Sequence, residues 1–277
     1  MTESLRRFPD WWQAANESGS TEALARVPAV REHSCGYSES IESLAEEVPV
    51  ALVYNGSSHA VMMATPKDLG DFAVGFSLSE GLVGEAREIE LVDCLHLASG
   101  ISLQMLIPQH RFAAIAGRDR KLGGRTGCGL CGTADLEAAI RPVRTVASTA
   151  PPQRQTLLDA FSLLHRQQPL NAASGAVHAA GLLVAGGALI AREDVGRHNA
   201  VDKVLGAAIR HGLRPCVLLV TSRASYELVH KAAQLGCTTV AAISGPTAMA
   251  VRIAEQAGVN LVGFAREDRM TIYHRAV

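Results

Sequence analysis

The chain has 277 residues, 48% hydrophobic and 19% charged, so it is long enough for one or two domains and too apolar to be intrinsically disordered. Its net charge of −1 argues against a protein that binds nucleic acid through a cationic surface. Residues 1–145 carry 13 basic and 19 acidic side chains, whereas residues 146–277 carry 13 and 8. This excess of cations in the second half favours an anionic ligand there.

Residues 1–28 lack a sustained pattern and are expected to form a tail or a loosely docked helix. A smaller N-terminal α+β domain is predicted over residues 29–149. Its hairpin signal is Asn55-Gly56, and Thr65-Pro66 predicts the N-terminus of a helix that runs to about Glu80. The expected strands are 38–44, 48–54, 59–64, 89–97 and 101–107.

Residues 117–132 contain six glycines and a CxxC pair, and they are predicted to form a mobile basic loop. A helix near 133–140 closes the first domain, and residues 150–153 are the expected linker. Residues 150–277 then alternate between strands and helices, which predicts a parallel sheet covered by helices on both faces. The expected elements are helices 155–167, 198–211, 224–235 and 246–257, a hairpin over 174–191, and strands 216–221, 238–243 and 260–264.

Two features concern the cellular location. The six cysteines, in a long chain without an apolar signal segment at its start, do not form the disulfide framework of a small secreted protein, so a cytoplasmic location is expected. Residues 171–191 are uncharged, and their length of 21 residues approaches that of a membrane span. Gly186-Gly187 favours two buried segments joined by a turn instead, so no membrane association is expected.

The CxxC pair consists of Cys128 and Cys131. Such a pair is half of a zinc site, a redox pair or a sulfur carrier. The chain has no second CxxC, and no His or Cys is followed by Glu two positions later, which argues against the zinc site of a deaminase. Four nearby cations favour thiolate over thiol, as a sulfur carrier requires: Arg118, Arg120, Lys121 and Arg125. A zinc ion shared across a dimer, and a glycine-rich loop without function, remain open alternatives.

Two other segments are candidate binding sites. Residues 193–203 run into a helix start that can bind a phosphate or a base edge. The alternative is a cluster of caps and salt bridges, with Asp202 and Lys203 on a solvated face. Loops 221–223 and 244–247 follow strands, and ligands bind at the carboxyl ends of strands in open α/β sheets.

A third strand-end segment covers residues 264–269. Its Arg266 and Arg269 can bind phosphates through bidentate hydrogen bonds. The alternative is an exposed turn, which the acidic Glu267 and Asp268 favour.

Five stretches together resemble the FdhD family of formate dehydrogenase accessory sulfurtransferases. They are 47–81, 124–132 (GRTGCGLCG), 193–206 (EDVGRHNAVDKVLG), 221–236 and 261–273. The resemblance implies a sulfur carrier that takes persulfide sulfur from an IscS-type cysteine desulfurase. The carrier would pass this sulfur to the molybdenum (or tungsten) bis-molybdopterin guanine dinucleotide cofactor before the cofactor enters formate dehydrogenase. The activity of formate dehydrogenase would require this transfer.

The resemblance also assigns roles to residues. Cys128 carries the persulfide and Cys131 assists. The cofactor-binding segment is Phe264, Ala265, Arg266, Glu267, Asp268 and Arg269, although the negative charge of Glu267 and Asp268 argues against direct contact with phosphates. The resemblance further implies a homodimer and a C-terminal three-layer α/β/α domain that resembles the cytidine deaminase fold without its zinc.

Two alternatives of a different class remain. In one, the chain is a nucleotide- or cofactor-binding chaperone of formate dehydrogenase whose CxxC is a redox switch. In the other, it is a purely structural chaperone that tolerates the loss of both cysteines.

Overall fold

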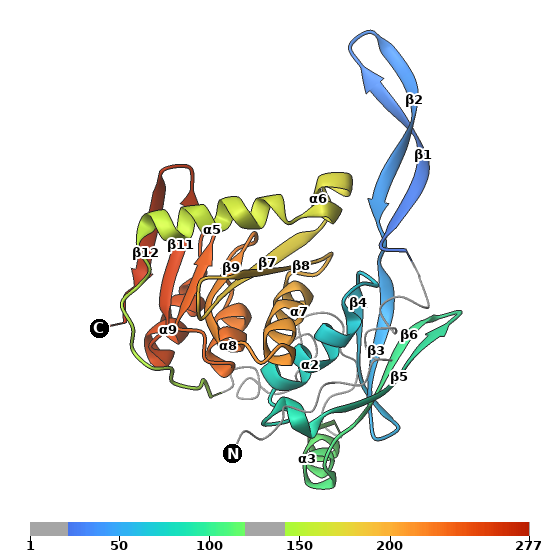
Figure 1. Cartoon of the computed structure of the whole chain (residues 1–277). Coiled ribbons are helices and arrows are strands. Elements are labelled where there is room, and N and C mark those ends of the chain that lie inside the picture. Colours follow the sequence, from blue (N-terminus) through green and yellow to red (C-terminus); the bar gives the residue numbers. More distant parts are fainter. Residues whose placement is uncertain (1–21, 120–141, 277) are drawn as a thin grey trace.

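The computed structural model describes residues 22–119 and 142–276. These residues form a mixed α/β protein with three sheets of two, four and six strands (Figure 1). The four-stranded sheet has the order β4-β3-β6-β5, and the six-stranded sheet has the order β12-β11-β10-β9-β7-β8. Among the described residues, no helix is both long and apolar enough to cross a membrane.

The two-stranded sheet is an antiparallel ribbon of β1 (Leu24–His33) and β2 (Gly36–Ala45) that projects from the body of the molecule (Figure 1). The expectation of a tail over residues 1–28 is therefore wrong for residues 24–28, which lie in β1. Pro28 within β1 obscured the strand pattern, because proline is tolerated only where one edge of a strand is unpaired, as in this ribbon.

The four-stranded sheet confirms the predicted hairpin at Asn55-Gly56. Both residues have positive φ, 49° and 82°, as a tight turn between antiparallel strands requires. β3 also pairs in parallel with β6, so the hairpin is joined to the later strands. The strands are β3 (Val48–Tyr54), β4 (Ser57–Ala64), β5 (Glu90–Leu97) and β6 (Gly100–Leu106), and the helical elements of this unit are α2 (Leu69–Ser79), η1 (Ala86–Glu88) and α3 (Gln109–Asp119).

Helix α2 begins later than predicted. Its N-cap is Asp68, with φ 54°, rather than Thr65. Thr65 is fully buried, and its backbone N–H donates to Asp194 Oδ2 at 3.1 Å, while its hydroxyl accepts from the Val195 N–H. Thr65 is therefore committed to a contact with the second half of the chain, which sequence-local capping rules cannot anticipate. The helix ends at Ser79 with Glu80 as its C-cap, close to the predicted end, and Gly81 follows with φ 66°.

The six-stranded sheet contains the predicted β-α-β-α-β run, in which β9, β10 and β11 are parallel. The sheet as a whole is mixed, because β7, β8 and β12 extend this parallel run and are antiparallel to their neighbours. The uncharged stretch 171–191 covers most of the β7–β8 hairpin and the short helix before it. The elements are α5 (Arg154–Arg166), α6 (Pro169–Ser174), β7 (His178–Val184), β8 (Leu189–Asp194), α7 (Arg197–Arg210), β9 (Pro215–Val220), α8 (Tyr226–Gln234), β10 (Thr239–Ala242), α9 (Ala248–Ala257), β11 (Asn260–Arg266) and β12 (Arg269–His274).

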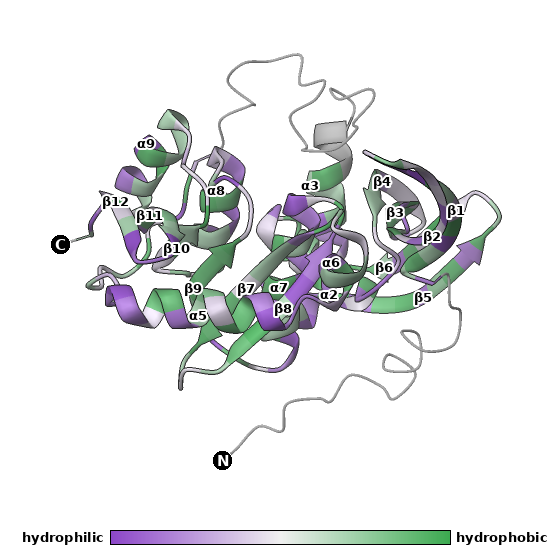
Figure 2. Cartoon of the chain, turned by 90° about the horizontal axis from the view of Figure 1, so that it is seen from above, coloured by the Kyte–Doolittle hydropathy of each residue, from purple (hydrophilic) through white to green (hydrophobic). Residues whose placement is uncertain are grey.

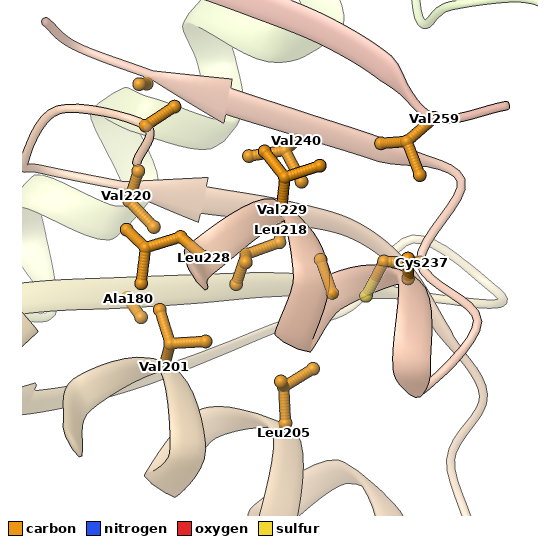
Figure 3. Close-up of a cluster of buried hydrophobic side chains, with 14 of the residues drawn as sticks. Ala180, Val201, Leu205, Leu218, Val220, Leu228, Val229, Cys237, Val240 and Val259 are labelled. Carbon is orange, nitrogen blue, oxygen red and sulfur yellow. The ribbon is translucent and has the colours of Figure 1, made fainter. Parts of the chain in front are cut away.

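Helices cover both faces of this sheet. Leu157 and Leu164 of α5 pack on one face against Leu219 and Val262. α7, α8 and α9 pack on the other, where Val201 and Leu228 meet Leu218 in a fully buried apolar cluster (Figure 3). Viewed from above, α2 and α7 lie between the two larger sheets (Figure 2).

The crossing of α2 and α7 depends on two glycines. A Cβ atom on Gly75 would lie 1.7 Å from the Asp202 carbonyl oxygen, and one on Gly206 would lie 2.0 Å from the Asp71 carbonyl oxygen. Each glycine therefore allows a close approach of the two backbones, which joins the N-terminal and C-terminal halves.

Candidate functional site

Cys128 and Cys131 lie outside the described residues, but the two ends of the segment that carries them are placed. The segment follows α3, whose Ile115 is buried in the N-terminal core. The chain is described again from Pro142, whose carbonyl oxygen lies 3.1 Å from His230 Nε2 of α8. Arg144 then donates to the carbonyl of Gln234, at the end of α8. The CxxC segment thus leaves one half of the protein and returns on the other, at α8.

Loops 221–223 and 244–247 follow β9 and β10, as expected, and the loops at the carboxyl ends of β9, β10 and β11 form one continuous edge. Ala224 and Pro246 form a parallel bridge, and the Thr247 N–H donates to the Ala224 carbonyl. The Phe264 N–H donates to the Ser244 carbonyl at 3.2 Å. Backbone hydrogen bonds therefore hold the three strand ends in register with one another.

The predicted cofactor-binding residues 264–269 form the hairpin between β11 and β12. Phe264 and Glu267 have positive φ, 53° and 58°, and Ala265 is fully buried. Arg266 and Arg269 are exposed and directly opposite each other across the turn. Like charges opposite one another are unfavourable in a hairpin, so an anion between them would relieve their repulsion. Of the two acidic turn residues, Asp268 accepts a hydrogen bond from Arg154 at its backbone carbonyl.

A cluster of titratable residues lies at the same edge, beside the end of β9. His198 Nε2 in the first turn of α7 lies 2.5 Å from Glu227 Oε2 in the first turn of α8. Although burial favours the neutral form of Glu227, the hydrogen bond with His198 holds the pKa of this carboxyl below its ordinary value. Burial and the charge of Arg197 lower the pKa of His178 below 6.5. No sequence spacing links His178 or Glu227 to residues 193–203, so neither residue could be identified from the sequence.

Most of the segment 193–203 is internal rather than a ligand site. Asp194 and Lys203 have fully buried side chains and form an ion pair of 2.6 Å. Lys203 Nζ also donates to the Thr65 carbonyl, and the Asn199 amide donates to Asp194 and to the Met63 carbonyl. The alternative of caps and salt bridges therefore holds for these residues, and they join α7 to the end of β4. The expected solvated position of Asp202 and Lys203 is wrong, because they are 1% and 0% exposed.

A second buried charge cluster connects α2, α7 and α8. Lys231 Nζ donates to both carboxylate oxygens of Asp202 at 2.9 Å and to Glu80 at 2.7 Å. Against the effect of burial, Asp202 and Glu80 hold the pKa of Lys231 above its ordinary value, which retains the cation. This network links α8, where the CxxC segment returns, to the C-terminal end of α2.

Metal ligation is not evident in the part of the chain that the structure describes. No three His, Cys, Asp or Glu side chains among residues 22–119 and 142–276 are grouped so that they could hold a metal ion. Because Cys128 and Cys131 are outside these residues, the expected absence of zinc remains a prediction.

The fold and site define a mixed α/β protein with one cationic strand-end edge and a CxxC segment that joins its two halves. The chain belongs to the FdhD/NarQ family, whose model matches residues 45–277. This match extends through all five stretches that carried the resemblance.

Individual relatives agree. The chain is 47% identical over 255 residues to the "Sulfur carrier protein FdhD" of Xanthomonas axonopodis pv. citri (strain 306), covering 89% of each chain. It is 49% identical over 235 residues to the protein of the same description from Cupriavidus necator, covering 84% of this chain and 82% of the relative. A crystal structure of a candidate formate dehydrogenase accessory protein from Desulfotalea psychrophila has the same fold, with a TM-score of 0.69 at 23% identity over 91% of this chain and 97% of the other.

Proposed function

We propose that this protein is a sulfur carrier that takes persulfide sulfur from an IscS-type cysteine desulfurase. It passes the sulfur to the molybdenum (or tungsten) bis-molybdopterin guanine dinucleotide cofactor before that cofactor enters formate dehydrogenase. The observation that carries the proposal is the family membership, together with relatives described as sulfur carriers at 47% identity. On this proposal the chain acts as a sulfurtransferase, in the cytoplasm and as a homodimer, with the desulfurase and the dehydrogenase as partners.

The first half-reaction needs a thiolate on the carrier. The Cys128 thiolate attacks the terminal sulfur of the desulfurase persulfide, so that an S–S bond forms on Cys128 and the desulfurase cysteine leaves as a thiolate. Arg125 and the other nearby cations favour the thiolate of Cys128 electrostatically. Cys131 assists as the neighbouring thiol.

The second half-reaction needs a docking site for a large anion. The strand-end edge supports this role, because Arg266 ends β11, Arg269 begins β12 across the turn, and Arg197 begins α7 directly after β8. Guanidinium groups bind phosphates through two parallel hydrogen bonds. We assign the guanine nucleotide ends of the cofactor to this edge, with Arg266 and Arg269 as the principal contacts.

The chain between Cys128 and Pro142 is long enough for Cys128 to serve both the desulfurase and the cofactor site at the strand-end edge. Cys128 precedes Pro142 by 14 residues, which span at most roughly 46 Å at 3.3 Å per residue. Pro142 contacts helix α8 through His230. This helix is nine residues long, about 13 Å at 1.5 Å per residue, and Glu227 in its first turn borders the strand-end edge. The 14 residues between Cys128 and Pro142 can therefore extend farther than the length of helix α8.

Mass spectrometry after incubation with a cysteine desulfurase and cysteine tests the proposal. The wild-type protein should gain one sulfur atom, the Cys128→Ala variant none, and the Cys131→Ala variant should still gain it but mature formate dehydrogenase less well. Cys35→Ala is the matched control, because Cys35 is exposed yet lies outside the CxxC pair. Loading on Cys131 alone would reverse the two roles. Normal dehydrogenase maturation by the double variant Cys128→Ala/Cys131→Ala would instead support a chaperone.

A further inference from the structure

The N-terminal four-stranded sheet carries two largely apolar rows on its outer face, the side away from α2, beside a polar row that contains Gln104 and Asp93. Val50, Leu52 and Leu103 point inward and pack with α2, so the alternating residues form the outer face. The strand register gives one row of outer residues across all four strands, Val61–Ala51–Ser102–Leu95, and a neighbouring row with the pairs Met63–Pro49 and Leu97–Gly100.

The large side chains of these rows remain accessible. Val61 is 45%, Met63 47%, Leu95 39% and Leu97 55% exposed. A sheet with strands antiparallel at both edges and one face in solvent normally presents polar side chains on that face. Neither of these two rows contains a charged residue. A contiguous apolar surface of this kind marks an interaction site.

The chain itself contains a segment suited to this surface. Residues 1–21 include Leu5, Phe8, Trp11 and Trp12, which are apolar and contain both tryptophans of the protein. Tryptophan and phenylalanine gain much from burial because of their large apolar area.

The point of attachment places this segment close to the outer face. The Ala23 carbonyl accepts a hydrogen bond of 2.9 Å from the Glu46 N–H, three residues before Pro49. Trp12 precedes Ala23 by 11 residues, which reach up to roughly 36 Å, whereas the three residues from Glu46 to Pro49 span at most about 10 Å. The segment is long enough to reach both rows.

We propose that residues 1–21 dock on this outer face, so that Phe8, Trp11 and Trp12 pack against Val61, Met63, Leu95 and Leu97. The N-terminal segment then forms the outermost layer of the N-terminal half. This inference stands independently of the sulfur-carrier proposal.

Tryptophan fluorescence of the full-length protein tests the docking, since both tryptophans lie in the segment. We expect acrylamide to quench the wild-type protein at most about half as strongly as a synthetic peptide of residues 1–21. Val61→Glu should raise the quenching toward the peptide value. Ile272→Glu should leave it unchanged, because Ile272 is similarly exposed, at 41%, but lies on β12 of the other large sheet.

A milder variant keeps the test valid if Val61→Glu fails to fold. Val61→Thr has nearly the same shape and should raise the quenching partially, with an unchanged circular dichroism spectrum. Wild-type quenching equal to that of the peptide, or no response to either substitution, overturns the proposal. Quenching that weakens as protein concentration rises, or Val61 substitutions that alter only the sedimentation coefficient, would assign this face to a second copy of the chain and also overturn it.

Discussion

At the scale of single residues, the Lys203–Asp194 pair is central to the protein interior. Both side chains are fully buried, and Asp194 also accepts from the Gly196 N–H at 2.7 Å. Removing one member of a buried ion pair leaves an uncompensated charge, which costs about 3–5 kcal/mol. Lys203→Met should therefore lower the free energy of unfolding by this amount in urea titrations. Lys67→Met is the control, because Lys67 is exposed, and equal unfolding midpoints for the two variants would contradict the assignment.

His178 makes stability depend on pH in a defined direction. Burial and Arg197 lower its pKa in the folded protein below 6.5. Between pH 6.5 and the lower pKa of folded His178, the unfolded chain binds a proton that the folded protein does not. The contribution of neutral His178 to the free energy of unfolding is therefore present above pH 6.5 and is lost as the pH falls through the folded pKa. Unfolding in urea at pH 7.5 and at pH 5.5 should show a smaller loss of stability for His178→Gln than for wild type. The exposed His165→Gln should keep the wild-type dependence, and an unchanged pH dependence in His178→Gln would refute this prediction.

At the scale of elements, the α2–α7 crossing unites the two halves. An alanine within a helix normally gains about 1 kcal/mol over glycine. At Gly75 its Cβ would lie 1.7 Å from a backbone oxygen that cannot move independently, so overpacking of about 1–3 kcal/mol or more outweighs the gain. Gly75→Ala should thus lower the thermal unfolding midpoint. Gly84→Ala should change it little, because the nearest neighbours of a Cβ there are the flexible side-chain ends of Arg111 and Glu88. Similar midpoints for both variants would show that α2 and α7 can separate without cost.

At the scale of the whole molecule, we propose that the strand-end edge, which several loops assemble, binds an anion. Arg266 and Arg269 face each other across the β11–β12 turn. Loss of each charge-assisted contact should cost about 1.5–3 kcal/mol of binding. Calorimetry with GDP should therefore show weaker binding for Arg266→Ala/Arg269→Ala, while Arg252→Ala on the exposed surface of α9 binds normally. Equal GDP affinity in the double variant would remove this site from the hairpin.

The sequence alone determined the features that depend on local chemistry. The hairpin at Asn55-Gly56 and the β-α-β-α-β run are encoded by turn residues and apolar periodicity. The CxxC pair and the five matching stretches also sufficed to indicate the family, which the family match over 45–277 confirms. The roles of Cys128 and Cys131 remain predictions, because these residues are outside the described part of the chain.

Only the tertiary structure decided which polar residues are internal. Thr65 has the sequence of a helix cap, and Lys203 lies on a predicted solvated face, yet both meet Asp194 in the core. Thr65 lies more than 100 residues from Asp194 in the sequence, and Lys203 lies on a different element from Asp194. Local spacing therefore does not reveal either contact. Likewise, His178 and Glu227 approach the start of α7 because β7 and β9 pair side by side. The physical reason is that burial and pairing of charges depend on which elements pack together, and local sequence patterns do not specify that packing.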